Sequence, residues 1–212
     1  MYAIKRSLRF IRGAVLTYGP SFIKRSVWNK EYLTDKWNFN DSTTADCIYP
    51  YLENYSNNGT ILDLGCGSGN TANELSLHSY TRYVGVDISD SALSKARSWT
   101  ENNGRTAKNT FVRGDLLSYV PTQQFDVILF RESMYHVPLG KVKGVLDHYA
   151  QYLKPDGVII VRMHAGDNNW KPKYRPTAML RSIERQFDVL HKAESRIGRL
   201  GTILVFRPRQ AA

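Results

Sequence analysis

The stretch Ile61-Leu62-Asp63-Leu64-Gly65-Cys66-Gly67-Ser68-Gly69-Asn70 is typical of a short buried strand, a glycine-rich turn and the first residue of a helix. Three glycines in five residues let the backbone pass close to a ligand that any side chain would push away. The helix that follows directs its free backbone N–H groups at the same ligand. A second apolar strand, 83–86, leads into Asp87, whose carboxylate can accept hydrogen bonds from both hydroxyls of a ribose. The sequence therefore predicts a nucleotide-type binding crevice.

From this point the chain alternates strand and helix patterns. We expect strands at 60–64, 82–87, 109–113, 125–130 and 158–161, helices at 70–78, 90–103, 139–152 and 176–186, and a turn at 154–157. Strands separated by helices of this length indicate parallel βαβ units. Two β-like runs, 187–195 and 200–206, then predict a hairpin with its connection at 196–199. The expected fold is a Rossmann-like α/β sheet of seven strands, mostly parallel, with an antiparallel C-terminal hairpin and helices on both faces.

The N-terminal part has a different pattern. Residues 1–16 place Ile4, Leu8, Ile11 and Val15 at helical spacing, with four basic residues largely off that stripe. Such a basic amphipathic helix can lie on an anionic membrane or a partner, or pack on its own domain. Residues 28–55 are rich in aromatics and predict a loop, then a helix starting near Asp41. We therefore divide the chain into a basic helix plus aromatic-rich lid, 1–55, and a binding domain, 56–212.

The charge of the chain is positive and uneven. The 212 residues carry a formal net charge of +10, with eight Lys/Arg against two Asp/Glu in residues 1–36 and eleven against four in 157–212. A basic surface can attract nucleic acid, phosphate-bearing partners or an anionic membrane, and it can equally serve solubility. Two cysteines are too few for a disulfide framework, so we expect a reducing, cytoplasmic setting. No apolar run approaches the ~18–20 residues that span a bilayer.

The glycine pattern separates two classes of nucleotide site. It is G-x-G-x-G preceded by an acidic residue, and this differs from the G-x-G-x-x-G of dinucleotide sites. The chain resembles class I S-adenosylmethionine-dependent methyltransferases over about residues 60–163. The resemblance rests on the stretch 63–69, on Asp87, on Gly114-Asp115-Leu116, on Phe125-Asp126-Val127-Ile128 and on 153–158.

That resemblance implies a role for each matching residue. Around the methionine part of S-adenosylmethionine it places Asp63, Gly65, Cys66, Gly67, Gly69 and Asn70. Asp87 is expected at the ribose, and Ile88, Asp115 and Leu116 at the adenine. Phe130, Arg131 and Glu132 are expected beneath the methionine and the sulfonium. The product would be S-adenosylhomocysteine, and no metal is expected.

The segment after the strand 125–130 carries the candidates for catalysis. A hydroxyl acceptor usually needs a base, and His is the usual base near neutral pH. We assign this role to His136, with Tyr135 or Glu132 orienting the acceptor. His164 is a second candidate, and a His here can also pack over the cofactor without proton transfer. The segment 131–134 lacks the Asn/Asp-Pro-Pro-Tyr/Phe motif, which disfavours methylation of base amines or of protein glutamine.

Residues 28–39 and 130–133 also look similar to small bacterial methyltransferases encoded among polysaccharide-assembly genes. This looser likeness implies a glycan hydroxyl or another small polar molecule as acceptor, with the basic first helix in peripheral contact with the inner face of the membrane. Two alternatives stay open. One is an RNA methyltransferase that uses the basic surface, and the other is a catalytically silent, donor-binding scaffold.

Overall fold

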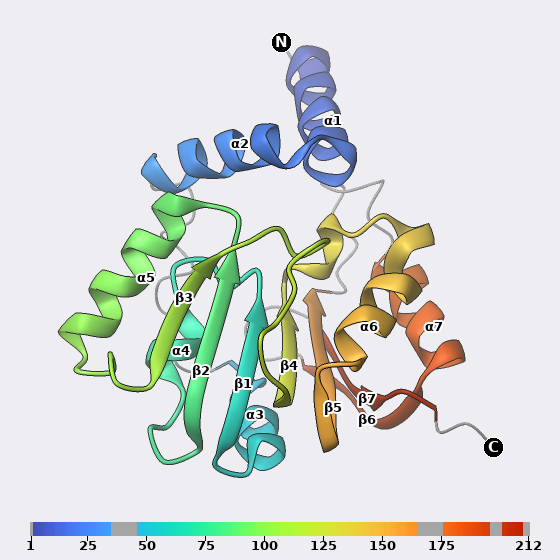
Figure 1. Cartoon of the computed structure of the whole chain (residues 1–212). Helices are drawn as coiled ribbons and strands as arrows, with labels where there is room; N and C mark the ends of the chain where they lie inside the picture. The colour runs from blue at the N-terminus through green and yellow to red at the C-terminus, as the bar shows by residue number, and fades with distance from the viewer. Residues whose placement is uncertain (1, 35–45, 165–175, 196–200, 210–212) are drawn as a thin grey trace.

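The computed structural model describes residues 2–34, 46–164, 176–195 and 201–209, and the side chains of 2–9 and 195 lie outside that description. These residues contain one seven-stranded sheet with the order β3-β2-β1-β4-β5-β7-β6 (Figure 1). Strands β1 to β5 pair in parallel, whereas β7 is antiparallel to both β5 and β6. The strands are β1 Gly59–Leu64, β2 Tyr80–Asp87, β3 Asn109–Arg113, β4 Phe125–Arg131, β5 Leu153–His164, β6 Asp188–Ser195 and β7 Gly201–Arg207. The predicted fold class is confirmed.

Helices cover both faces of the sheet because neighbouring strand residues point to opposite sides. Leu62 and Leu64 of β1 pack in a core with α6 and α7, whereas Ile61 packs in a second core with α3, α4 and α5. The helices are α1 Tyr2–Tyr18, α2 Ser21–Leu33, α3 Tyr49–Ser56, α4 Asn70–Glu74, α5 Asp90–Asn102, α6 Val142–Ala150 and α7 Pro176–Gln186, with 3-10 turns η2 Met134–His136 and η3 Leu139–Lys141. Both layers hold fully buried aliphatic side chains, which fixes the register of the strands.

Three sequence predictions differ from the structure. The helix expected at 70–78 ends at Glu74, and the turn expected at 154–157 is extended backbone within β5. Lys154 in that segment pairs with Asp126 of β4, 2.6 Å away, which holds the chain against the sheet. Helix α2 was not predicted at all. The helix expected near Asp41 and the connection 196–199 fall outside the described residues.

The carboxyl ends of β1 to β5 meet at one edge of the sheet, where open α/β sheets bind ligands. Helix α2 lies across this edge, and α1 extends away from the body of the molecule (Figure 1). Within residues 1–55, α2 lies across this edge (Figure 1), while Tyr49 and Leu52 of α3 pack in the same core as Ile61 of β1. No helix within the described residues is long and apolar enough to cross a membrane.

Candidate functional site: the donor crevice and its surroundings

The glycine turn after β1 needs its glycines. Gly65, Gly67 and Gly69 have φ values of 83°, 56° and 83°, a region that other residues rarely adopt. A Cβ on Gly67 would lie 2.6 Å from the Tyr32 hydroxyl of α2, and one on Gly69 would lie 2.8 Å from the Cβ of Ala96 on α5. The turn is therefore bare backbone, with Tyr32 of α2 and Ala96 of α5 packed closely against it.

Asp63, at the end of β1, is a buried acid beside this turn. Its Oδ2 accepts a hydrogen bond from the Tyr83 hydroxyl, while Oδ1 has no hydrogen-bond partner among the described residues. Burial raises the pKa of Asp63 to about 6, although the Tyr83 hydroxyl, the charge of Arg131 and the Thr71 hydroxyl oppose the shift. A buried carboxylate oxygen without a partner is costly unless a ligand supplies one. The α-ammonium group in the methionine part of S-adenosylmethionine is positively charged, and it can donate a hydrogen bond to this oxygen.

Asp87, at the end of β2, connects the two neighbouring turns. Its Oδ2 accepts the N–H of Gly67 at 2.9 Å, and its Oδ1 accepts the N–H of Ser89 at 2.8 Å. Burial raises the pKa of Asp87, while these two N–H groups lower it. Each carboxylate oxygen keeps a further lone pair, so the side chain can also accept from ribose hydroxyls. Ile88 lies between Asp87 and the N-cap Ser89, and it is half-buried at the crevice edge.

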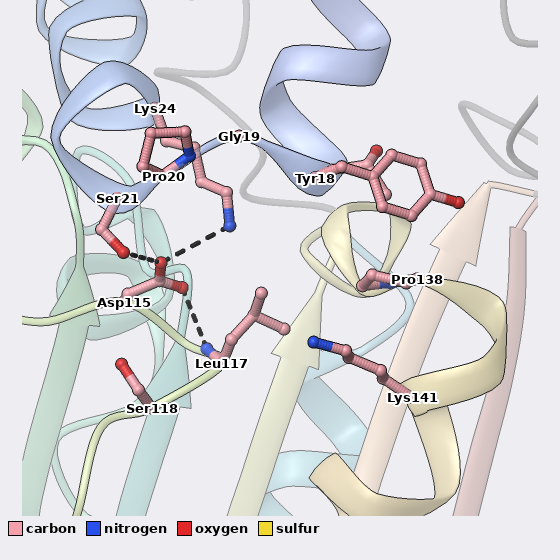
Figure 2. Close-up of a pocket in the computed structure, with 11 residues that line it drawn as sticks. Tyr18, Gly19, Pro20, Ser21, Lys24, Asp115, Leu117, Ser118, Pro138 and Lys141 are labelled. Carbon is pink, nitrogen blue, oxygen red and sulfur yellow. Dashed lines mark hydrogen bonds and ion pairs between the residues drawn. The ribbon is translucent and has the colours of Figure 1, made fainter.

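Asp115 lies in the loop after β3 and is covered by α2. Its Oδ1 accepts from the N–H of Leu117 at 3.0 Å, and its Oδ2 accepts from Ser21 at 2.6 Å and lies 3.5 Å from Nζ of Lys24 (Figure 2). The carbonyl of Leu116 accepts from the Tyr149 hydroxyl of α6 at 2.9 Å, which fixes the loop. The acid expected at the adenine amino group is thus already bound by two side chains of α2.

A cavity of about 260 Å³ opens beside Asp115, under the junction of α1 and α2 (Figure 2). Lys24 and Lys141 approach it from opposite sides. It is lined by Thr17, Tyr18, Gly19, Pro20, Ser21, Lys24, Asp115, Leu117, Ser118, Pro138 and Lys141. Of the residues predicted to hold the donor, Asp115 is the one that lines this cavity, which reaches Lys141 of η3 on its other side.

Comparison with known proteins agrees with this geometry. A family model described as "Methyltransferase domain" matches residues 38–194, more than half of the chain and the whole donor crevice. The chain belongs to the class I S-adenosylmethionine-dependent methyltransferases. Its predicted family is thereby confirmed.

Curated relatives that this chain resembles include sterol 24-C-methyltransferases. The chain is 32% identical over 100 residues to a sterol 24-C-methyltransferase of Pneumocystis carinii, covering 47% of this chain and 26% of that one. It is 27% identical over 158 residues to the sterol 24-C-methyltransferase ERG6B of Gibberella zeae, covering 74% and 36%. The chain spans about a quarter to a third of the length of these curated relatives.

Solved structures share the fold of the methyltransferase at low sequence identity. The N-methyltransferase NodS of Bradyrhizobium japonicum, in complex with S-adenosylhomocysteine, has a TM-score of 0.68 and 16% identity, covering 88% of this chain and 98% of that one. The magnesium protoporphyrin IX methyltransferase ChlM of Synechocystis, with bound S-adenosylmethionine, has a TM-score of 0.68 and 20% identity, covering 88% and 96%.

Arg131 and Glu132, which follow β4 in the methyltransferase, belong to a chain of alternating charges. Arg131 donates to Asp46 at 2.7 Å, and Asp46 lies 3.6 Å from Arg162, which in turn pairs with Glu132. Burial alone would raise the pKa of Asp46, but Arg131 and Arg162 hold it below its usual value. Glu132 has a φ of 57°, so its backbone at the expected sulfonium edge is strained.

Sequence reasoning missed Asp46 and Arg162 in this network. Arg162 is a lone charged residue inside the apolar run 158–163, and a charge in a buried strand signals a buried partner. Asp46 offers no comparable signal, because acidic residues near helix starts are common. Ser21 and Lys24 were missed because the helix that carries them was missed.

Two of the three catalytic candidates, Tyr135 and Glu132, interact with each other, whereas His136 packs against α2. The Tyr135 hydroxyl donates to the carbonyl of His164 at 3.1 Å and accepts from the N–H of the same residue. Burial and the Glu132 carboxylate raise the pKa of Tyr135 well above its usual value, so this hydroxyl stays protonated and joins η2 to the end of β5. His136 instead faces α2, its ring 5.1 Å from Trp28 in an edge-to-face arrangement.

Three further residues predicted at the donor are Cys66, Asn70 and Phe130, and each has defined surroundings in the structure. Cys66 is buried, and burial together with Asp87 and Asp63 raises the pKa of its thiol, so it remains a neutral turn residue. Asn70 begins α4 and accepts from the Ser68 hydroxyl at 3.1 Å. The Phe130 side chain is fully buried against Tyr149, with ring centroids 5.7 Å apart, so only its backbone lies at the crevice.

Proposed function

We propose that this methyltransferase transfers the methyl group of S-adenosylmethionine to a hydroxyl oxygen of a small-molecule or glycan acceptor. The supporting observation is the buried Asp63 oxygen beside a bare glycine turn, with Asp87 and Asp115 at the ends of the next two strands. Bound S-adenosylmethionine supplies an activated methyl group on a cationic sulfur. The residues of the chain must then orient the acceptor, exclude water and take up its proton.

We assign to His136 the role of the base that accepts the proton of the acceptor hydroxyl. In the proposed reaction, the acceptor oxygen forms a bond to the methyl carbon as the S–CH₃ bond breaks, and the bonding electrons remain on sulfur as S-adenosylhomocysteine. The hydroxyl proton passes to the imidazole of His136, whose ring packs edge-to-face against Trp28 of α2. Tyr135 and Glu132 serve as positioning residues, because Tyr135 binds the backbone at His164 and Glu132 pairs with Arg162.

A small-molecule acceptor is supported by the relatives, which include a sterol 24-C-methyltransferase, an N-methyltransferase and a magnesium protoporphyrin IX methyltransferase. We also propose that α1 contacts an anionic membrane. Phe10 and Ile11 of α1 are 53% and 57% exposed, which fits a helix that meets an apolar surface.

Donor binding is tested by the melting temperature of the protein with and without S-adenosylmethionine. We expect a rise for the wild type and none for Asp87→Ala. Asp87→Asn keeps an acceptor for the turn and controls for loss of fold, and Asp147→Ala removes an exposed acid on α6 as a matched control. A wild-type protein without a ligand-induced rise would overturn the proposal.

The acceptor is tested by mass spectrometry of metabolite extracts incubated with the protein and a deuteriomethyl donor. One labelled hydroxyl product is expected, and its formation should fall about 100-fold or more in His136→Ala, as for loss of a general base. His78→Ala removes an exposed His elsewhere. Donor binding without any labelled small molecule would favour the silent scaffold, and labelled RNA would favour the nucleic-acid enzyme.

A further inference from the structure

Helix α2 packs on the protein with a mixed side, where Trp28 and Tyr32 accompany Lys24 and Glu31, and it exposes apolar side chains on the other side. Lys24 and Glu31 are only 7% and 8% exposed, although they are charged. Phe22 and Leu33, in contrast, are each 72% exposed, and Ile23 is 38% exposed. A surface helix of a globular protein normally keeps its apolar stripe on the core. The exposed side of α2 therefore calls for an apolar partner.

Specific polar contacts fix this orientation of α2 along its length. Ser21 donates to Asp115 at 2.6 Å near the start of the helix, and Arg25 donates to Asp90 at 2.5 Å one turn later. Near the end of the helix, Glu31 pairs with Arg12 of α1. Rotating α2 to bury its apolar side would break all of these contacts, so the outward position of Phe22 and Leu33 is built into the fold.

Two exposed apolar residues lie on one side of α2, near its two ends, with the exposed Ser26 between them. Phe22 and Leu33 are eleven residues apart, which is about three turns of helix, so their side chains lie on the same side. Lys30 is exposed and lies near this line, one turn before Leu33, and Ile23 lies next to Phe22. We define the α2 outer face as Phe22, Ile23, Lys30 and Leu33. It contains no acidic residue.

Charge favours an anionic partner, and it comes from the basic residues other than Arg12, Lys24 and Arg25, which pair with acidic residues of the protein. Residues 2–34 contain seven Lys/Arg and one Glu, and that Glu is buried on the inner side of α2. Apolar side chains with a lysine among them, on a strongly basic segment, match the interface of an anionic bilayer, where lysine stems lie along lipid and ammonium groups reach the headgroups.

We propose that the α2 outer face docks on an anionic membrane surface. This inference extends the contact proposed for α1 to a second helix and a different set of residues. It also gives the contact an orientation, because α2 lies across the carboxyl edge of the sheet (Figure 1). Docking would bring the donor crevice, and the cavity beside Asp115, next to the lipid headgroups. The docking itself does not depend on methyl transfer.

The test is sedimentation of the full chain with vesicles of phosphatidylcholine, alone or mixed with phosphatidylglycerol. We expect clear binding to the mixed vesicles and a partition coefficient about tenfold lower or more for Phe22→Ser/Leu33→Ser, because two apolar anchors are lost. Leu77→Ser/Val120→Ser is the matched control, since both residues are exposed and lie away from α2. Lys30→Glu should weaken binding only to the mixed vesicles.

Other outcomes overturn the inference. Equal pelleting of the α2 variant and the control, or equal binding to both kinds of vesicle, contradicts docking on an anionic bilayer. A wild-type dimer that Phe22→Ser/Leu33→Ser converts to a monomer, without vesicle binding, assigns the α2 outer face to a second copy of the chain. The donor-induced rise in melting temperature is measured on the same variants, and it should be unchanged. Failure of docking can thus be told from failure of donor binding or of folding.

Discussion

The hydroxyl of Tyr83 on β2 donates to Oδ2 of Asp63 on β1 at 2.5 Å, inside the protein. This bond stabilises Oδ2 of the carboxylate, while Oδ1 is buried without a hydrogen-bond partner among the described residues. Because burial outweighs the bond, the pKa of Asp63 lies at about 6, above the ordinary range for Asp. The acid at the end of β1 is therefore poised to change its protonation state when a cation binds beside it.

Donor affinity should depend on pH through Asp63. Because the pKa of Asp63 is raised, the folded state binds the proton of this carboxyl more tightly than the unfolded state does. The resulting contribution to the free energy of unfolding is lost as the pH rises through about 6. A cationic ligand favours the ionised form, so binding should release a proton near pH 6, and affinity should fall as the pH drops below 6. Titration calorimetry in two buffers of different ionisation enthalpy measures the release.

The matched variants for this prediction are Asp63→Asn, which removes the titrating group, and Asp147→Asn, which removes an exposed acid. Proton release should vanish in the first and persist in the second. Identical heats in the two buffers for the wild type would show that Asp63 does not face the cationic part of the ligand.

Lys24 should couple α2 to donor binding. Its side chain is buried beside Asp115, and Lys24→Met leaves that carboxylate with Ser21 and the Leu117 N–H. Loss of one partner of a buried pair should lower the free energy of unfolding by about 1–3 kcal/mol. The adenine amino group can supply the missing donor, so the ligand-induced rise in melting temperature should be larger than in the wild type.

Lys30→Met, at an exposed position of the same helix, controls for loss of charge. The coupling is refuted when Lys24→Met and the wild type show the same ligand-induced rise despite a lower melting temperature of the variant alone.

Tyr149 should stabilise the loop after β3, which carries Leu116, a residue expected at the adenine. Its hydroxyl donates to the Leu116 carbonyl at 2.9 Å from a ring that is otherwise fully buried. Tyr149→Phe should cost about 1 kcal/mol of unfolding free energy and weaken donor binding, because the loop after β3 loses its anchor. Urea unfolding and donor titration measure both effects. Tyr55→Phe on α3, at the other end of the sheet, should change neither, and an equal effect of the two substitutions would contradict the anchor role.

The sequence predicted the sheet well because its strands are strongly apolar and their turns are rich in glycine. β3 matches its expected bounds, and the ends of β1, β2 and β4 place the predicted donor residues at one edge. The sequence did not predict α2, since hydrophobic periodicity locates helices by a buried apolar side, and the buried side of α2 carries Lys24 and Glu31. Nor did it predict that Asp115 is covered by Ser21, a contact between residues 94 positions apart.

Arg162 should be the most sensitive member of the buried charge network. Its side chain is 9% exposed and lies between Asp46, which is 7% exposed, and Glu132, which is 36% exposed. Arg162→Met leaves Asp46 with Arg131 alone and Glu132 without its cation, so the free energy of unfolding should fall by about 3 kcal/mol. Chemical denaturation of the variant measures this loss.

Glu132→Gln is the informative comparison, because it removes only the more exposed end of the same pair. Solvent screening at this position should limit its cost to less than about 1 kcal/mol. Since Arg162 also fixes the strained residue at the end of β4, Arg162→Met should weaken donor binding in addition, whereas Glu132→Gln should leave it nearly unchanged. Equal losses of stability in the two variants would mean that the Arg162–Asp46 contact contributes little, and that the Arg131–Asp46 pair alone stabilises the network.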